Sequence, residues 1–282
     1  MNQHLVSLLQ LYTNEEILQI CKSLNKNYNI YDPESVRWRQ IEYVLNKTPK
    51  SEIKQLRNNC LSNGIVNDLI FNYYFCERVI KYHFIKNLRS KMNHIVAFEM
   101  TIGDSRVDIC RINGCSYAYE IKTEYDTFDR LHSQIRDYTK TFEKVYVIVP
   151  RKRVNSIRQI IPESCGIISY RISSDNIIFS YARKAQKNNC NIIFCIENLS
   201  SNDMSYLLKQ LGEKSCQSKV QKRDKLVDIS NKKPIWAQYR KLLKNKYEKR
   251  WGFLTDHFDE ILPIDIQSFF SSKIDPNLLY KK

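Results

Sequence analysis

The spacing of apolar residues divides the chain into helical and strand-like stretches. The first sixty or so residues favour short helices. Between Ile65 and Lys91 no proline or glycine interrupts the sequence, and the apolar positions recur at helical spacing, as Leu69, Ile70, Tyr73, Ile80 and Phe84. This pattern predicts one long helix.

A different pattern begins at His94. Three short runs rich in β-branched and aromatic residues follow one another, HIVAFEMT, SRVDICRI and SYAYEIKT. The turn signals Gly103-Asp104 and Asn113-Gly114 separate them. We therefore expect an antiparallel meander, with a type I′ turn at Asn113-Gly114 because both residues tolerate positive φ.

The next stretch returns to helical spacing. Asp126 is a candidate N-cap for a helix from about Thr127 to Thr141, VYVIVP is a nearly all-apolar buried strand, and RVNSIRQII is another helix. The predicted order is helix, three strands, helix, strand, which is an α+β fold with a mixed sheet. We expect an N-terminal helical region over 1–62, this core over 63–181, and a helical C-terminal region over 182–282.

Charge adds a candidate partner. The 282 residues include 43% hydrophobic ones, which favours a globular protein, and the 45 Lys and Arg against 30 Asp and Glu give a formal charge of +15. Such a field attracts polyanions, so nucleic acid is the first partner to consider. Residues 209–250 hold fourteen of the basic residues and only four of the acidic ones.

Within that basic stretch, four aromatic and apolar residues form a helical stripe, Trp236, Tyr239, Leu243 and Tyr247. Four basic residues lie largely off the stripe, Arg240, Lys241, Lys244 and Lys249. Two interpretations stay open. The cations form either a solvated face on a helix that packs by its aromatics or a surface that follows nucleic-acid phosphates.

Several classes are not supported. No apolar run approaches the roughly 20 residues of a membrane span, and the amino end lacks the features of a secretory leader, so we expect a soluble, cytoplasmic protein. The nine cysteines form no CxxC pair, which favours reduced thiols over a zinc site or disulfide framework. The sequence contains no glycine-rich phosphate loop, so an ATP-driven activity is not supported.

The candidate chemistry lies in the predicted hairpin. Asp108 and Glu120 fall on adjacent strands, where cross-strand neighbours come within about 5 to 8 Å. Glu120 and Lys122 are two residues apart, so both leave the same face while Ile121 points into the core, and its carbonyl is a candidate ligand. Hard cations such as Mg²⁺ prefer these oxygen ligands. Lys122 would then orient or deprotonate an attacking water.

Asp108 followed about a dozen residues later by Glu120-Ile121-Lys122 resembles the signature of the PD-(D/E)xK nucleases, the restriction-endonuclease-like superfamily. The predicted element order is similar to that superfamily's αβββαβ core. Val107 stands where the signature has proline. The run EIKTEYDTFDRLHSQIRDY also resembles a little-characterised group of bacterial proteins often borne on phages or mobile elements. The resemblance covers about a third of the chain, from Leu69 to Val149.

The resemblance implies a deoxyribonuclease that uses Mg²⁺, with Mn²⁺ as a substitute, and leaves 5′-phosphate ends. Gln134 and Tyr138 match the QxxxY element of RecB-like and lambda-exonuclease-like members, and four residues apart on a helix they share a face. The superfamily often draws a further acid from its first helix, for which Glu77 and Glu99 are rivals. Arg130 is a candidate phosphate contact, and the protein could act as a homodimer.

Other interpretations compete with this one. Asp108 with Arg106 could be an ordinary strand-edge ion pair, and Glu120 with Lys122 a solvated pair on an exposed strand. Two further functions stay open. The first is a catalytically silent nucleic-acid-binding protein on a nuclease scaffold. The second is a protein-interaction or regulatory module whose charge serves solubility.

Overall fold

The chain forms two compact units. A computed structural model describes residues 2–89, 94–173 and 176–268, and each unit is treated by itself below. The first unit comprises the residues up to His83 together with those from His257, and the second runs from Phe84 to Asp256. This division differs from the three regions expected along the sequence, because residues 257–268 fold with the N-terminal helices.

The first unit is helical. Its helices are α1 (Gln3–Leu9), α2 (Asn14–Asn27), α3 (Glu34–Val44), α4 (Lys50–Asn59), α5 (Ser62–Tyr73), the first half of α6 (Glu77–Arg89) and the short 3₁₀ helix η2 (Pro263–Asp265). Apolar faces at helical spacing form its core, with Cys21, Trp38 and Leu69 almost fully buried. The buried Tyr28 hydroxyl donates a hydrogen bond to Asp265 at 2.5 Å, which fastens η2 to these helices.

The second unit is built on a six-stranded mixed sheet whose strands follow one another in space in chain order. The strands are β1 (Ile95–Ile102), β2 (Ser105–Asn113), β3 (Cys115–Ile121), β4 (Lys144–Pro150), β5 (Gly166–Ser173) and β6 (Asn176–Arg183). The pairs β3–β4 and β4–β5 are parallel, and the other neighbours are antiparallel. Strand β4 is buried from Val145 to Pro150, as expected of a central strand with parallel neighbours on both sides.

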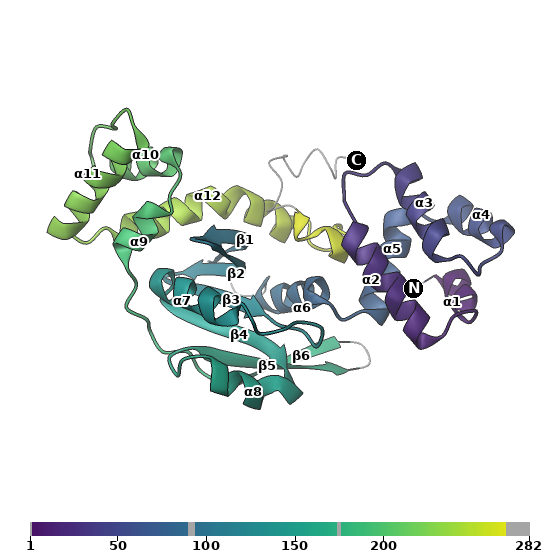
Figure 1. The fold of residues 1–282 in the computed structure, drawn as a ribbon. Helices are drawn as coiled ribbons and strands as arrows, with labels where there is room; N and C mark the ends of the chain where they lie inside the picture. Colours follow the sequence, from purple (N-terminus) through teal and green to yellow (C-terminus); the bar gives the residue numbers. More distant parts are fainter. Residues whose placement is uncertain (1, 90–93, 174–175, 269–282) are drawn as a thin grey trace. The chain divides into compact units, whose positions relative to one another are not determined.

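Some helices of this unit pack on the sheet, and others pack on helices (Figure 1). They are the second half of α6, α7 (Leu131–Thr141), the 3₁₀ helix η1 (Arg151–Arg153), α8 (Val154–Ile160), α9 (Ile192–Glu197), α10 (Ser201–Gln210), α11 (Lys219–Lys232) and α12 (Trp236–Asp256). Helix α7 contacts β1, β2 and β4 through apolar residues at i, i+4 and i+7, namely Leu131, Ile135 and Tyr138. Helix α12 packs along β1.

The predicted α+β class with a mixed sheet is confirmed, and so is the order helix, three strands, helix, strand from α6 to β4. The β5–β6 hairpin was not among the predicted elements. Its two runs, GIISYRIS and NIIFSYAR, are rich in β-branched and aromatic residues and flank polar residues, the ordinary signal of a hairpin.

Three local predictions are wrong. The long helix from Ile65 is two helices, because Tyr74 is extended and the Cys76 N–H closes a tight turn on the Tyr74 carbonyl at 2.7 Å. Residues 90 and 91 of that predicted helix lie outside the described residues. Asn113-Gly114 is not a type I′ turn, since only Gly114 has positive φ. Helix α7 begins at Leu131 instead of Thr127.

Two expectations from composition can be compared with the described residues. No helix among them is long and apolar enough to cross a membrane. All nine cysteines are free, and five of them are buried. The end of the predicted C-terminal region, 269–282, lies outside the described residues.

Candidate active site

Asp108 and Glu120 lie level with each other on neighbouring strands. Ile109 pairs with Tyr119 in the antiparallel ladder of β2 and β3, and the next position along the ladder brings Asp108 opposite Glu120. Both side chains are buried, with exposed fractions of 7% and 2%. The Asp108 carboxylate accepts a hydrogen bond from the Ile121 N–H at 2.7 Å, which ties the two strands together at this point.

Lys122 follows the last residue of β3 and returns to the same face as Glu120. Its Nζ lies 2.7 Å from Glu120 Oε1 and donates a second hydrogen bond to Gln134 Oε1 at 3.1 Å. The Lys122 side chain is only 13% exposed. The alternative of a solvated Glu120–Lys122 pair on an exposed strand is therefore wrong.

Helix α7 supplies two side chains to this pair. Gln134 reaches Lys122, and the Tyr138 hydroxyl lies 2.8 Å from Glu120 Oε2 and 2.7 Å from the Arg106 carbonyl. Gln134 and Tyr138 thus share one face of α7 and meet the acid and the lysine, as their spacing predicted. Burial, followed by the negative charges of Glu120 and Asp108, raises the pKa of Tyr138 well above its usual value, so its hydroxyl stays a donor.

The charges around Lys122 hold it in its protonated form. Burial by itself would lower the pKa of this ammonium group, but the negative charges of Glu120, Asp108 and Asp126 outweigh that effect and raise the pKa above its usual value. Lys122 therefore carries a positive charge at neutral pH. It is suited to donate hydrogen bonds and to stabilise negative charge rather than to accept a proton.

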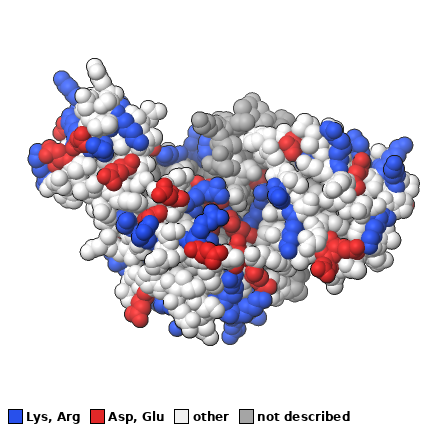
Figure 2. All heavy atoms as spheres, viewed as in Figure 1, with Lys and Arg blue, Asp and Glu red and all other residues white. Residues whose placement is uncertain are grey.

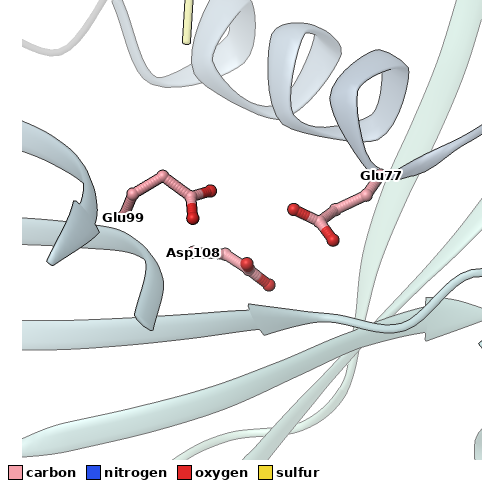
Figure 3. Close-up of side chains that lie close together, drawn as sticks. All are labelled: Glu77, Glu99 and Asp108. Carbon is pink, nitrogen blue, oxygen red and sulfur yellow. The ribbon is translucent and has the colours of Figure 1, made fainter. Parts of the chain in front are cut away.

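Glu99 faces Asp108 from β1. Phe98 pairs with Ile109 and Met100 with Val107, so the register places Glu99 opposite Asp108. Carboxylate oxygens of these two residues lie within 4.8 Å of each other, and Figure 3 shows the side chains converging. Glu99 has a left-handed backbone with φ of 53°, a conformation that costs a non-glycine residue about 1 to 3 kcal/mol and that clusters at functional sites.

Arg106 pairs with Glu99, at 2.6 Å from the guanidinium Nε to the carboxylate. The Arg106 side chain is 69% exposed whereas that of Glu99 is 7% exposed. Sequence reasoning had offered Asp108 as the partner of Arg106. In the structure Arg106 pairs with Glu99 instead, and its side chain is largely exposed to solvent.

Glu77, the other rival, is the first residue of α6 and pairs with the buried Lys81 one turn later. It precedes Phe84 by seven residues, so the two share one side of the helix. The Phe84 ring contacts Tyr119 of β3 at 4.9 Å between centroids. Figure 3 draws Glu77 together with Glu99 and Asp108.

The remaining predicted positions differ in their surroundings. Ile121 points into the core, as expected, and its N–H is the group that meets Asp108. Arg130 is exposed at the N-cap of α7. Asp126, expected to cap that helix, instead accepts hydrogen bonds from the N–H and the hydroxyl of Thr123, and so shapes the loop after Lys122.

The four basic candidates of the C-terminal region lie on α12, whose buried face includes Tyr239 and Leu243. Arg240 approaches Glu143 at 3.5 Å and is 29% exposed, while Lys241 and Lys249 are exposed and Lys244 is half-buried. Part of the surrounding positive charge is neutralised locally. Figure 2 shows acidic and basic side chains interleaved over α10 and α11, where Lys225 pairs with Glu213 and Lys232 with Asp228.

Sequence reasoning missed the basic tripeptide of η1. Arg153 donates hydrogen bonds to the carbonyls of Thr123 and Asp126, and its guanidinium lies 3.8 Å from the centre of the Phe128 ring. This arginine fixes the loop that follows Lys122. No spacing in the sequence links residues 153 and 123, so only the fold could reveal the contact.

Fold and site together define an α+β protein with a cluster of buried acids and a lysine along the neighbouring strands β1, β2 and β3 of a mixed sheet. The chain belongs to the family described as Bacteriophage P4 protein cII, whose family model matches residues 71–269. That match covers the sheet, every residue of the cluster and the basic C-terminal helices.

Two individual proteins show more limited similarity. Protein cII of Enterobacteria phage P4 is 24% identical over 108 residues, which are 38% of this chain and 41% of the phage protein. The chain thus matches less than half the length of that relative. A protein of unknown function from Silicibacter pomeroyi aligns with 39% of this chain and 71% of its own, at 14% identity and a TM-score of 0.31, a likeness that says nothing about function.

Proposed function

We propose that this protein is a divalent-metal-dependent nuclease that hydrolyses phosphodiester bonds in DNA. The observation that carries the proposal is the placement of Asp108, Glu120 and Lys122 on one face of the sheet, with a second acid, Glu99, opposite Asp108. Carboxylates beside a protonated lysine are the groups that phosphodiester hydrolysis needs, because the transition state gains negative charge.

The acids fit a hard cation. Glu99 and Asp108 present oxygens within 4.8 Å of each other, and Mg²⁺ and Mn²⁺ prefer such oxygen ligands. Glu77, the other acid that the resemblance suggested, stays a prediction. A bound cation would neutralise developing charge and lower the pKa of a coordinated water. The left-handed backbone of Glu99 supports the assignment, since strain of this kind persists where function requires it.

The other residues have positioning and charge roles. The protonated Lys122 would donate to the attacking water or to a phosphate oxygen and stabilise the charge that accumulates there. Gln134 and Tyr138 would hold the lysine and Glu120 in place, because Gln134 accepts a hydrogen bond from Lys122 and Tyr138 donates one to Glu120. The Ile121 carbonyl as a ligand and Arg130 as a phosphate contact remain part of the proposal.

A second candidate is a nucleic-acid-binding protein whose cluster is structural and does not catalyse. This candidate is favoured because the acids already have protein partners. Lys122 and Tyr138 bind the two carboxylate oxygens of Glu120, and Arg106 contacts Glu99. A catalytic cluster requires Arg106 to leave Glu99 when a cation enters. Arg106 is 69% exposed, and the entering cation would replace its charge on Glu99.

Cleavage assays separate the two candidates. Plasmid, linear duplex and single-stranded DNA are incubated with the wild type in Mg²⁺, Mn²⁺ or chelator, alongside Asp108→Asn and Lys122→Gln. The matched controls are Asp129→Asn, an exposed acid of the loop that follows Lys122, and Lys184→Gln, an exposed lysine after β6. We expect metal-dependent cleavage that only the two site variants abolish. DNA binding without cleavage in either metal would favour the silent protein.

A further inference from the structure

A polar pocket lies on the same face of the sheet as Glu120 and Lys122. It has a volume of about 240 Å³ and opens between η1, β5 and β6. Its lining consists of two arginines, two serines, a tyrosine and an isoleucine, namely Arg151, Ser169, Tyr170, Arg171, Ile178 and Ser180. None of these positions belongs to the cluster described above.

The strand register places this pocket beside Lys122. Glu120 pairs with Val147, and the Lys122 N–H donates to the Ile148 carbonyl, so Lys122 comes level with Val149. Val149 in turn pairs with Ser169. Since neighbouring strands are about 4.8 Å apart, the backbones of Lys122 and Ser169 are about 10 Å apart across the sheet. Arg171, two residues beyond Ser169, leaves β5 on the same face.

The three basic residues of η1 have different surroundings. Arg153 is held by the carbonyls of Thr123 and Asp126, and Lys152 pairs with Glu124 at 2.7 Å. Both contacts join η1 to the loop that follows Lys122. Arg151 faces the other way and lines the pocket. The segment that carries Arg151 is therefore fixed to the segment that carries Lys122.

The pocket has the chemistry of a phosphate site. Arg151 and Arg171 are exposed, and neither forms a hydrogen bond or ion pair with any other residue that the structure describes. The Ser169 hydroxyl donates only a long hydrogen bond, 3.3 Å, to the Ser180 carbonyl. Two guanidinium groups present several N–H donors in a planar fork, which matches the oxygens of a phosphate and makes charge-assisted hydrogen bonds.

We propose that this pocket binds a backbone phosphate of the DNA strand whose scissile bond lies at Lys122. The inference rests on the proposed nuclease function and deepens it, because a second phosphate held about 10 Å across the sheet would align the strand with the acids. Such a contact positions the substrate without reading its sequence.

Binding measured without cleavage tests the pocket. The probe is a fluorescein-labelled 30-nucleotide single strand, titrated in chelator at several salt concentrations with the wild type and the variant Arg151→Ala with Arg171→Ala. We expect the variant to bind about tenfold more weakly than the wild type at 100 mM salt. Its plot of log affinity against log salt concentration should be shallower by about 0.7, the slope of one phosphate contact on a single strand. The pair Arg151→Gln with Arg171→Gln keeps side-chain length and should behave alike.

The control variant, Arg39→Ala with Lys54→Ala, removes the same charge from exposed positions of α3 and α4. Three results would overturn the inference. They are equal binding by the pocket variant and the wild type, an equal loss of binding in the control, and no binding by the wild type. The phosphate-site inference and the nuclease proposal can fail independently. Selective weakening without any cleavage sustains the phosphate site while the nuclease fails, and cleavage with unchanged binding does the reverse.

Discussion

Glu99 stands opposite Asp108 in the register of β1 and β2, and among the described non-glycine residues it is the one with positive φ. The two strands pair normally on either side of it, at Phe98 and at Met100. The distortion is thus confined to one residue. It brings a second carboxylate to Asp108 at the expense of local backbone strain.

This relationship predicts opposite effects of Glu99→Gly on stability and on metal binding. Glycine adopts positive φ without a steric penalty, so we expect the free energy of unfolding in chelator to rise by about 1 kcal/mol or stay unchanged. A ligand that binds the folded state raises the unfolding temperature. The rise that Mn²⁺ produces in the wild type should disappear in the variant. Thermal unfolding with and without Mn²⁺ measures both effects.

The control for this experiment is Glu42→Gly on α3, where the helical backbone gives glycine no advantage and the variant should be less stable. An undiminished Mn²⁺ response in Glu99→Gly would remove Glu99 from the proposed metal site.

The buried pair of Glu120 and Lys122 predicts non-additive stability. Lys122→Met removes the ammonium group and leaves Glu120, 2% exposed, without its cation, so we expect a loss of about 3 kcal/mol in the free energy of unfolding. Adding Glu120→Gln should restore most of that loss, because neither charge remains and the amide can still accept the Tyr138 hydrogen bond. Urea unfolding of the wild type, both single variants and the double variant gives the coupling.

The exposed pair of Lys152 and Glu124 is the matched control, for which the same substitutions should change stability little. A double variant as unstable as Lys122→Met alone would show that the lysine stabilises the protein in some way other than by neutralising Glu120.

The centre of the site could be predicted from the sequence because it depends on simple periodicities. Glu120 and Lys122 share a face since strand side chains alternate, and Asp108 comes level with Glu120 because a tight turn joins β2 and β3. Gln134 and Tyr138 share a face since four residues make about one helical turn. These relationships are local, and each follows from spacing along the chain.

Other features depend on contacts between distant parts of the chain. The break between α5 and α6 has no proline or glycine to mark it, and the left-handed backbone of Glu99 occurs inside an apolar run that reads as an ordinary strand. The choice between Glu77 and Glu99 could not be made from the sequence for the same reason. Only the register of β1 on β2 shows that Glu99 meets Asp108.

Tyr138→Phe should separate positioning from DNA binding. The ring is fully buried and should stay in place, but the hydroxyl that reaches Glu120 and the Arg106 carbonyl is lost. We expect the free energy of unfolding to fall by about 1 to 2 kcal/mol and the cleavage rate to fall, with DNA affinity unchanged. Tyr206→Phe, whose hydroxyl lies at the exposed surface near Asn245, should affect none of the three. Weaker DNA binding by Tyr138→Phe would contradict a purely positioning role.

Glu143 links the sheet to α12, and its surroundings predict a pH dependence of stability. Its side chain is 12% exposed, accepts the Ser116 N–H at 2.9 Å, and approaches Lys187 at 3.2 Å and Arg240 at 3.5 Å. Burial alone would raise the pKa of this carboxyl, but the Ser116 N–H and the two cations outweigh burial and lower it below its ordinary value of 4.5.

A carboxyl whose pKa is lowered by folding contributes stability that is present above its unfolded pKa and is lost as the pH falls through its folded pKa. Glu143→Gln should therefore unfold at a lower urea concentration than the wild type at pH 7, and the difference should shrink as the pH falls below about 4.5. Urea unfolding between pH 7 and pH 3 measures this, with the exposed Glu163→Gln as the control. A constant difference over that range would show that Glu143 acts through packing or geometry and not through its charge.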